Sequence, residues 1–220
     1  FRRVLFRSYF KSHVFKFDYG MLFLGGIALG AFLSAVLSGS FRAESIPTVW
    51  RERFGGSTAK RVIACPASIE LVAEMPPKPS SKYADEGTLL HDVISQILDC
   101  KATPESVIGM VYEGITLTQE LYDDKIAVAL AALDEIDPDK QMEFAVESSV
   151  NFGDLLPGVF GSADLLGRIG KKAIVLDWKF GNGVAVEATE NYQGMFYAAA
   201  AMRTPETAWV FEDVEEIEII

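Results

Sequence analysis

The pattern of apolar residues separates an uncharged N-terminal stretch from a longer part in which apolar and polar residues alternate. No charged residue occurs from Tyr19 to Phe41, and roughly 20 apolar residues suffice to span a bilayer as a helix. Gly26 and Gly30 form a G-x-x-x-G pair, which is typical of membrane helices that pack against one another. The pattern therefore predicts one transmembrane-like helix, followed by a loop, within residues 17–56.

Beyond about residue 57, some segments space their apolar residues as a helix does, and others space them as a strand does. Tyr83 to Thr88 lead into a helical apolar stripe from Leu89 to Leu98, which predicts a helix with His91 one turn in. The further elements expected are, in order, a helix at 119–136, strands at about 142–151, 159–168 and 173–180, a helix at about 189–202, and a strand from near Thr207. This order predicts an α/β fold with a mostly antiparallel hairpin core.

A short hairpin is predicted between the second and third strands, because Gly170 and Lys171 form a two-residue turn. This register places Asp164 directly opposite Asp177, with Cβ atoms about 5 Å apart. Like charges in that position are destabilising unless something binds between them, and a divalent cation would do so. Lys179 lies two residues beyond on the same strand face and adds an ammonium group. The hairpin therefore predicts a metal site suited to phosphodiester cleavage.

Charge is distributed unevenly along the chain, whose formal net charge is −11. Residues 1–61 hold ten Lys or Arg against three acids, whereas residues 62–220 hold ten against twenty-eight. Such asymmetry indicates two segments of different origin. Residues 1–8 resemble the translation of a sequencing adapter, so residues 1–16 are interpreted as an artefact or a basic leader. The alternating pattern at 214–220 looks like a strand cut in mid-course.

Four motifs in the second part resemble those of RecB-type PD-(D/E)XK nucleases of a phage-associated branch. They are, in order, Glu86-Gly87-Thr88-Leu89-Leu90-His91, Gly161-Ser162-Ala163-Asp164, Val175-Leu176-Asp177-Trp178-Lys179-Phe180-Gly181, and Asn191-Tyr192-Gln193 with Tyr197. The resemblance covers residues 57–220 and implies a restriction-endonuclease-like core that is incomplete at its C-terminus. It also implies hydrolysis of DNA phosphodiester bonds that depends on Mg²⁺ or Mn²⁺.

The resemblance assigns roles to individual residues. Asp164 and Asp177 would hold the metal together with His91, and the backbone carbonyl of Trp178 would be a further ligand. Hard cations choose carboxylate and water oxygens, and they stabilise charge on a scissile phosphate. Lys179 would reach the attacking water or the charge that develops on the phosphate.

The same resemblance places substrate contacts on the last helix. Gln193 and Tyr197 are spaced i, i+4 and therefore share one helix face; for Tyr197, packing is the alternative role. The acid that many relatives carry four residues after the histidine is Ser95 in this chain. Glu86 and Asp92 are the candidates to replace it.

Other residues bear on cofactors and location. Cys65 and Cys100 are too few for a zinc or an iron–sulphur site, and reduced thiols suit a cytoplasmic protein. Glu147, on the strand before the hairpin, is expected to face solvent rather than add a carboxylate to the cleft. The excess of acids opposes binding to a polyanion, and metal ions would offset this locally.

Two other functions remain open alongside the nuclease. One is a catalytically inactive nucleic-acid-binding or assembly module of the same fold, against which the presence of both aspartates and Lys179 counts. The other is a membrane sulphur-transporter fragment, because residues 17–60 resemble part of the YeeE/YedE-type sulphur-transport membrane proteins and would attach the chain to a membrane. This alternative predicts further apolar spans, and none follows Phe41. DNA is the expected partner, with a phage recombination or replication protein as a further candidate.

Overall fold

The computed structural model describes residues 29–34, 36–39, 50, 53–76, 79–180 and 188–220. The chain divides into two compact units, residues 1–45 and 46–220, which are treated separately. In the first unit the described residues up to Leu37 are helical and exposed. Within the described residues no helix is long and apolar enough to cross a membrane. Most of the transmembrane-like helix predicted within 17–56, and the basic leader before it, lie outside the described residues.

The second unit is built on a four-stranded mixed sheet in the order β3-β4-β5-β6. β3 (Glu143–Asn151), β4 (Phe160–Ile169) and β5 (Lys172–Leu176) pair antiparallel, and β6 (Glu216–Ile219) pairs parallel to β5. A parallel pair needs a crossover connection, and α9 (Tyr192–Ala201) lies in this one. The predicted α/β order of three strands, helix and strand is confirmed at this level.

The predicted helix that carries His91 is α5 (Lys82–Leu98). The side chain of Ser81 caps its first turn by accepting a hydrogen bond from the Ala84 N–H at 3.3 Å. The helix buries its apolar stripe, which consists of Leu89, Leu90, Val93 and Ile94. His91 directly follows Leu90 and lies at the edge of that stripe, with its side chain 30% exposed.

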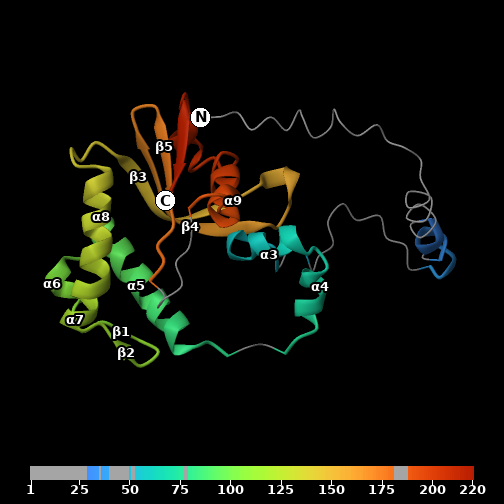
Figure 1. Ribbon diagram of the computed structural model, residues 1–220, viewed down its shortest axis with the longest axis horizontal. Coiled ribbons are helices and arrows are strands. Elements are labelled where there is room, and N and C mark those ends of the chain that lie inside the picture. The colour runs from blue at the N-terminus through green and yellow to red at the C-terminus, as the bar shows by residue number, and fades with distance from the viewer. Residues whose placement is uncertain (1–28, 35, 40–49, 51–52, 77–78, 181–187) are drawn as a thin grey trace. The chain divides into compact units, whose positions relative to one another are not determined.

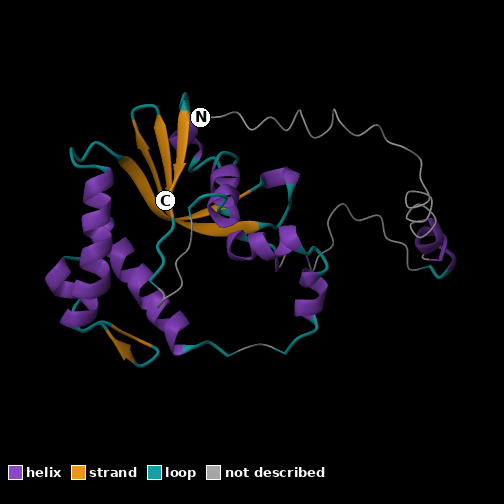
Figure 2. Ribbon diagram, in the orientation of Figure 1, coloured by secondary structure: helices purple, strands orange, loops and turns teal. Residues whose placement is uncertain are grey.

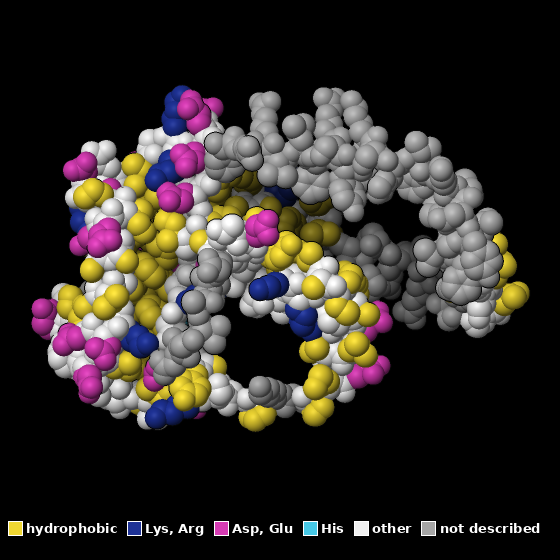
Figure 3. Space-filling view, in the orientation of Figure 1, with side chains coloured by type: hydrophobic (Ala, Val, Ile, Leu, Met, Phe, Trp, Pro, Cys, Tyr) yellow, Lys and Arg dark blue, Asp and Glu magenta, His cyan; other side chains and the backbone are white. Residues whose placement is uncertain are grey.

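The helix predicted at 119–136 is present, but its winding changes along its length. α7 (Gln119–Leu121) leads into a π-helical segment (Tyr122–Ala127) and then into α8 (Val128–Ile136). Tyr122 and Ile126 of the π-helical segment are buried. Three short elements before it were not predicted: α6 (Pro104–Val107), β1 (Val111–Tyr112) and β2 (Ile115–Thr116). Figure 3 shows many acidic side chains over α6, α7 and α8.

Alternating strand positions fill two separate cores, one on each face of the sheet. Leu165 and Leu176 pack in one core with buried residues of α5 and α8. Their neighbours Leu166 and Val175 pack in the other core with α9. Figures 1 and 2 show helices on both sides of the sheet. The unit therefore has three layers, with the sheet in the middle.

Two short helices, α3 (Ala59–Ala64) and α4 (Ser68–Ala73), precede α5 and were not predicted. The chain just before α3 packs on α9, since the ring of Phe54 meets the ring of Phe196 edge-on with centroids 5.6 Å apart. The predicted boundary near residue 57 therefore lies within the second unit.

Two predicted strand boundaries are wrong. The strand expected from near Thr207 begins only at Glu216, because the Thr207 hydroxyl donates a hydrogen bond to the Ala201 carbonyl and opens a 3-10 turn (Ala208–Phe211). The third strand ends at Leu176 rather than near residue 180. The N–H of Trp178 bonds to the Asp164 carboxylate instead of a neighbouring strand, and the ladder stops there.

Candidate active site

The β4–β5 hairpin has the predicted register. Leu165 pairs with Leu176 and Ile169 pairs with Lys172 across the two-residue turn. Asp164 directly precedes Leu165 and Asp177 directly follows Leu176, so the strands bring both carboxylates to the same end of the hairpin. The sequence prediction for this pair rested on the turn alone, and the turn was sufficient.

Asp164 is buried, with 9% of its surface exposed. Its Oδ2 accepts a 2.6 Å hydrogen bond from the Trp178 N–H. Burial and then the charges of Asp177 and Glu147 raise the pKa of Asp164 to about 7, while the Trp178 hydrogen bond and the charge of Lys179 oppose the rise. Because this carboxyl group is buried beside other negative charges, a bound cation would stabilise its ionised form.

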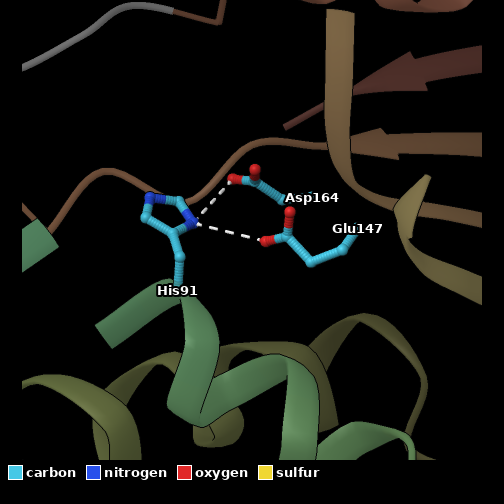
Figure 4. Close-up of side chains that lie close together, drawn as sticks. All are labelled: His91, Glu147 and Asp164. Carbon is cyan, nitrogen blue, oxygen red and sulfur yellow. Dashed lines mark ion pairs between the residues drawn. The ribbon is translucent and has the colours of Figure 1, made fainter. Parts of the chain in front are cut away.

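The side chains of His91, Glu147 and Asp164 converge from three different elements (Figure 4). The Nδ1 atom of His91 lies 3.4 Å from Oδ2 of Asp164 and 4.0 Å from Oε1 of Glu147. One ligand atom from each of the three residues lies within 4.8 Å of the others. His91 Nδ1 is buried and has no hydrogen-bond partner among the described residues. Burial lowers the pKa of His91, which favours the neutral imidazole that a metal needs.

Glu147 was expected to face solvent, and the structure places it at the rim of this cluster. Its side chain is 40% exposed, and its Oε2 accepts a 3.1 Å hydrogen bond from the Ser162 hydroxyl. The flanking residues Val146 and Ser148 pair regularly with β4, while Glu147 has a φ of +46°. A left-handed conformation is uncommon for a residue other than glycine, and such outliers concentrate at functional sites.

A second group of side chains surrounds Asp177. Lys179 forms an ion pair with Asp177 and donates a 3.1 Å hydrogen bond to Oε1 of Gln193. The Nε2 of Gln193 donates to Oδ1 of Asp177 at 3.0 Å and contacts the Tyr197 hydroxyl at 2.9 Å. Asp177, predicted to be a metal ligand, is thus held by Lys179 and Gln193. All six predicted site residues lie in these two adjoining groups.

Tyr197 combines the two roles weighed for it, packing and contact with the site. A Cβ atom at Gly56 would lie 2.3 Å from Cε1 of its ring, and one at Gly161 would lie 2.9 Å from the same atom. The ring therefore fits only because both positions are glycine. Burial raises the pKa of Tyr197 to about 12, so the hydroxyl is neutral. This packing explains why the Gly161-Ser162-Ala163-Asp164 motif begins with glycine, since a larger residue there would clash with the Tyr197 ring.

Asn191 sets the start of α9 and thereby the position of Gln193. Its side-chain oxygen accepts hydrogen bonds from the N–H groups of Gln193 and Gly194, at 3.0 and 3.2 Å. A Cβ atom at Gly194 would lie 2.3 Å from Cγ2 of Ile219 on β6. The close approach of helix and strand at Gly194 brings Gln193 down to the hairpin.

A cavity of about 390 Å³ opens beside the cluster of His91, Glu147 and Asp164. It is lined by Thr88, His91, Asp92, Ser95, Glu147 and Asp164. Of the two candidates to replace the missing helix acid, Asp92 lines this cavity and Glu86 does not. The Asp92 carboxylate accepts a 2.9 Å hydrogen bond from Gln96. The cavity therefore joins acids from α5, β3 and β4, a donor set suited to hard divalent cations.

A family model described as "Protein of unknown function (DUF2800)" matches residues 53–220. No solved structure matches the chain. The matched region begins where Phe54 packs on α9 and includes every residue of the two groups.

Proposed function

We propose that this chain, which belongs to the phage-associated DUF2800 family, hydrolyses DNA phosphodiester bonds with a bound divalent metal ion. The observation that carries the proposal is the convergence of His91, Glu147 and Asp164 next to the ion-paired Lys179 and Asp177. A structural acid cluster would not need a buried carboxyl with a pKa of about 7 and an imidazole nitrogen without a hydrogen-bond partner among the described residues.

The residues present fit Mg²⁺ or Mn²⁺. His91 would supply a neutral nitrogen, and Asp164 and Glu147 would supply carboxylate oxygens. The metal would stabilise negative charge on the scissile phosphate and make a bound water more acidic. Asp177 lies near enough to Asp164 to raise its pKa, so it would add negative charge at the edge of the metal site.

The remaining residues would position the reacting groups. The Lys179 side chain is 40% exposed and can contact a phosphate at the rim. Gln193 holds that ammonium through Oε1 and holds Asp177 through Nε2, so one amide fixes the relative positions of a cation and an anion. Lys179 would then donate to the charge that develops on the phosphate oxygens.

The arrangement of elements supports a PD-(D/E)XK-like core. A helix precedes three antiparallel strands, the paired acids stand on β4 and just after β5, and α9 leads to a strand parallel to β5. The tight passage of α9 over the hairpin explains why Gln193 and Tyr197 meet the acids. This is the finer fold assignment that we propose for residues 57–220.

The test uses the full chain and linear duplex or single-stranded DNA, with Mg²⁺, Mn²⁺ or EDTA. Asp164→Asn and Lys179→Met should each lower the cleavage rate about 100-fold or more. Asp154→Asn, an exposed acid, and Lys171→Met, which is paired with Glu215 at the turn of the same hairpin, are the matched controls. Cleavage that persists in both site variants, or that ignores EDTA, would overturn the proposal.

A further inference from the structure

A second cavity, of about 350 Å³, lies where η1 (Gly56–Thr58) and α3 meet the start of β4. Arg53, Arg61, Ser57 and Phe160 contribute to its lining, and none of the described Asp or Glu residues does. This is unusual for a protein with a formal net charge of −11. Figure 3 shows Lys and Arg side chains over the segment of α3 and α4. We call the cavity the basic pocket.

The two guanidinium groups of the basic pocket are held by backbone carbonyls. Arg61 donates to the Ser68 carbonyl at 3.1 Å, and Arg53 lies at 3.5 Å from the Val72 carbonyl. In the described part of the chain neither is paired with a carboxylate. A guanidinium has five N–H donors, so these contacts orient each side chain and leave donors for a ligand. The exposed Ser57 adds a hydroxyl.

Short connections join the basic pocket to the cluster of His91, Glu147 and Asp164, which we call the acid cluster. Phe160 begins β4, and Asp164 lies four residues along the same strand, about 13 Å away at the usual strand rise. Gly56 of η1 packs directly on the ring of Tyr197, whose hydroxyl contacts Gln193. Phosphates on one DNA strand are about 3.4 Å apart along the helix axis. The two sites are therefore a few nucleotides apart.

We propose that the basic pocket binds a phosphate group of the nucleic-acid strand whose scissile bond lies at the acid cluster. This inference rests on the proposed function. Arginine matches a phosphate with two parallel N–H bonds, and contacts of this kind fix the register of a strand without reading its sequence. The net negative charge of the chain opposes binding to DNA. The arginines of the basic pocket would offset this repulsion locally. Phe160, 62% exposed, offers a face for an adjacent base.

The test measures binding and cleavage separately with the full chain. Fluorescein-labelled oligonucleotides are titrated in Ca²⁺ at several salt concentrations, and cleavage is measured in Mg²⁺. Arg53→Ala and Ser57→Glu should each weaken binding about fivefold or more. Loss of one phosphate contact should also reduce the slope of log K against log salt by about 0.7 to 0.9. The matched charge control is Lys140→Ala, whose ammonium pairs with Asp134 away from this pocket. At saturating substrate Lys140→Ala should keep a kcat within threefold of the unaltered chain.

A terminal phosphate and an internal phosphodiester are distinguished by oligonucleotides with a 5′-phosphate or a 5′-hydroxyl. A 5′-phosphate preference that Arg53→Ala abolishes assigns the pocket to the strand end, and equal binding assigns it to an internal phosphate. If the unaltered chain binds DNA through the pocket but does not cleave it, the hydrolysis proposal fails and the pocket stands. Pocket variants that bind like Lys140→Ala, or an unaltered chain that binds no oligonucleotide, would overturn the inference.

Discussion

The N–H of Trp178 donates a 2.6 Å hydrogen bond to Oδ2 of Asp164 at the point where β5 ends. This oxygen also lies 3.4 Å from Nδ1 of His91. One carboxylate therefore ends the ladder of the hairpin and also belongs to the cluster of His91, Glu147 and Asp164. β5 ends at Leu176, and Asp177, just beyond it, is contacted by both Lys179 and Gln193.

Asp164→Asn should stabilise the metal-free protein while it abolishes metal binding. The pKa of Asp164 is about 7 in the folded state against an ordinary value of 3.8, which corresponds to roughly 4 kcal/mol of unfavourable charge above neutral pH. An amide removes the charge and still accepts from Trp178, although it remains buried. We expect a gain of about 1–2 kcal/mol at pH 8 in urea unfolding with EDTA.

The pH dependence of that gain follows from the direction of the shift. The folded state binds the proton of Asp164 more tightly than the unfolded state does. The contribution of Asp164 to the stability of the metal-free protein should therefore be fully present below about pH 4 and should be lost as pH rises through about 7. Asp164→Asn should show no such loss. Asp154→Asn should retain it, and equal pH profiles for all three proteins would contradict the assignment.

Metal binding should weaken at acid pH. A proton on Asp164 competes with the cation, so affinity for Mn²⁺ should fall up to about tenfold per pH unit below pH 7 and level off above it. Burial lowers the pKa of His91, which favours the neutral imidazole. Calorimetric titration in two buffers of different ionisation enthalpy measures the proton released on binding. An affinity independent of pH from 5.5 to 8 would exclude Asp164 as a ligand.

The sequence predicts the register of the β4–β5 hairpin, but it does not predict how β3 pairs with β4. A two-residue turn leaves only one register, so Gly170 and Lys171 determined where Asp164 and Asp177 lie. The connection from Asn151 to Phe160 is longer and leaves the register of β3 undetermined. Glu147 could therefore not be placed opposite Asp164 from the sequence, and its left-handed backbone carries no sequence signal.

The segment around Thr207 was misassigned for a different physical reason. Trp209, Val210 and Phe211 have high strand propensity, but the hydroxyls of Thr204 and Thr207 both bond to carbonyls of α9 and continue its end as turns. The basic pocket was missed because its cations come from residues before 62, a region whose basic character was attributed to a separate segment.

Gly161→Ala should damage the site through Tyr197. The new Cβ atom would lie 2.9 Å from the Tyr197 ring and 3.2 Å from the Phe196 ring, and overpacking of this kind costs about 1–3 kcal/mol. We expect that loss in urea unfolding, together with reduced cleavage, because displacement of Tyr197 releases Gln193. Gly87→Ala, in α5 with no atom within 4 Å, is the control and should be neutral or slightly stabilising. Equal effects of the two substitutions would contradict the steric argument.

Gln193→Met should lower kcat through Lys179 rather than through folding. Gln193 accepts from Lys179 and donates to Asp177, so its loss frees the ammonium to move away from the phosphate. We expect a kcat lower by about tenfold, with a smaller change in KM and about 1 kcal/mol less stability. The control is Gln119→Met, which removes a Gln–Asp hydrogen bond of 2.8 Å at the start of α7. A positioning role also requires that Gln193→Met add little to the loss already caused by Lys179→Met. Independent, multiplicative losses in the double variant would show that Gln193 does not act through Lys179.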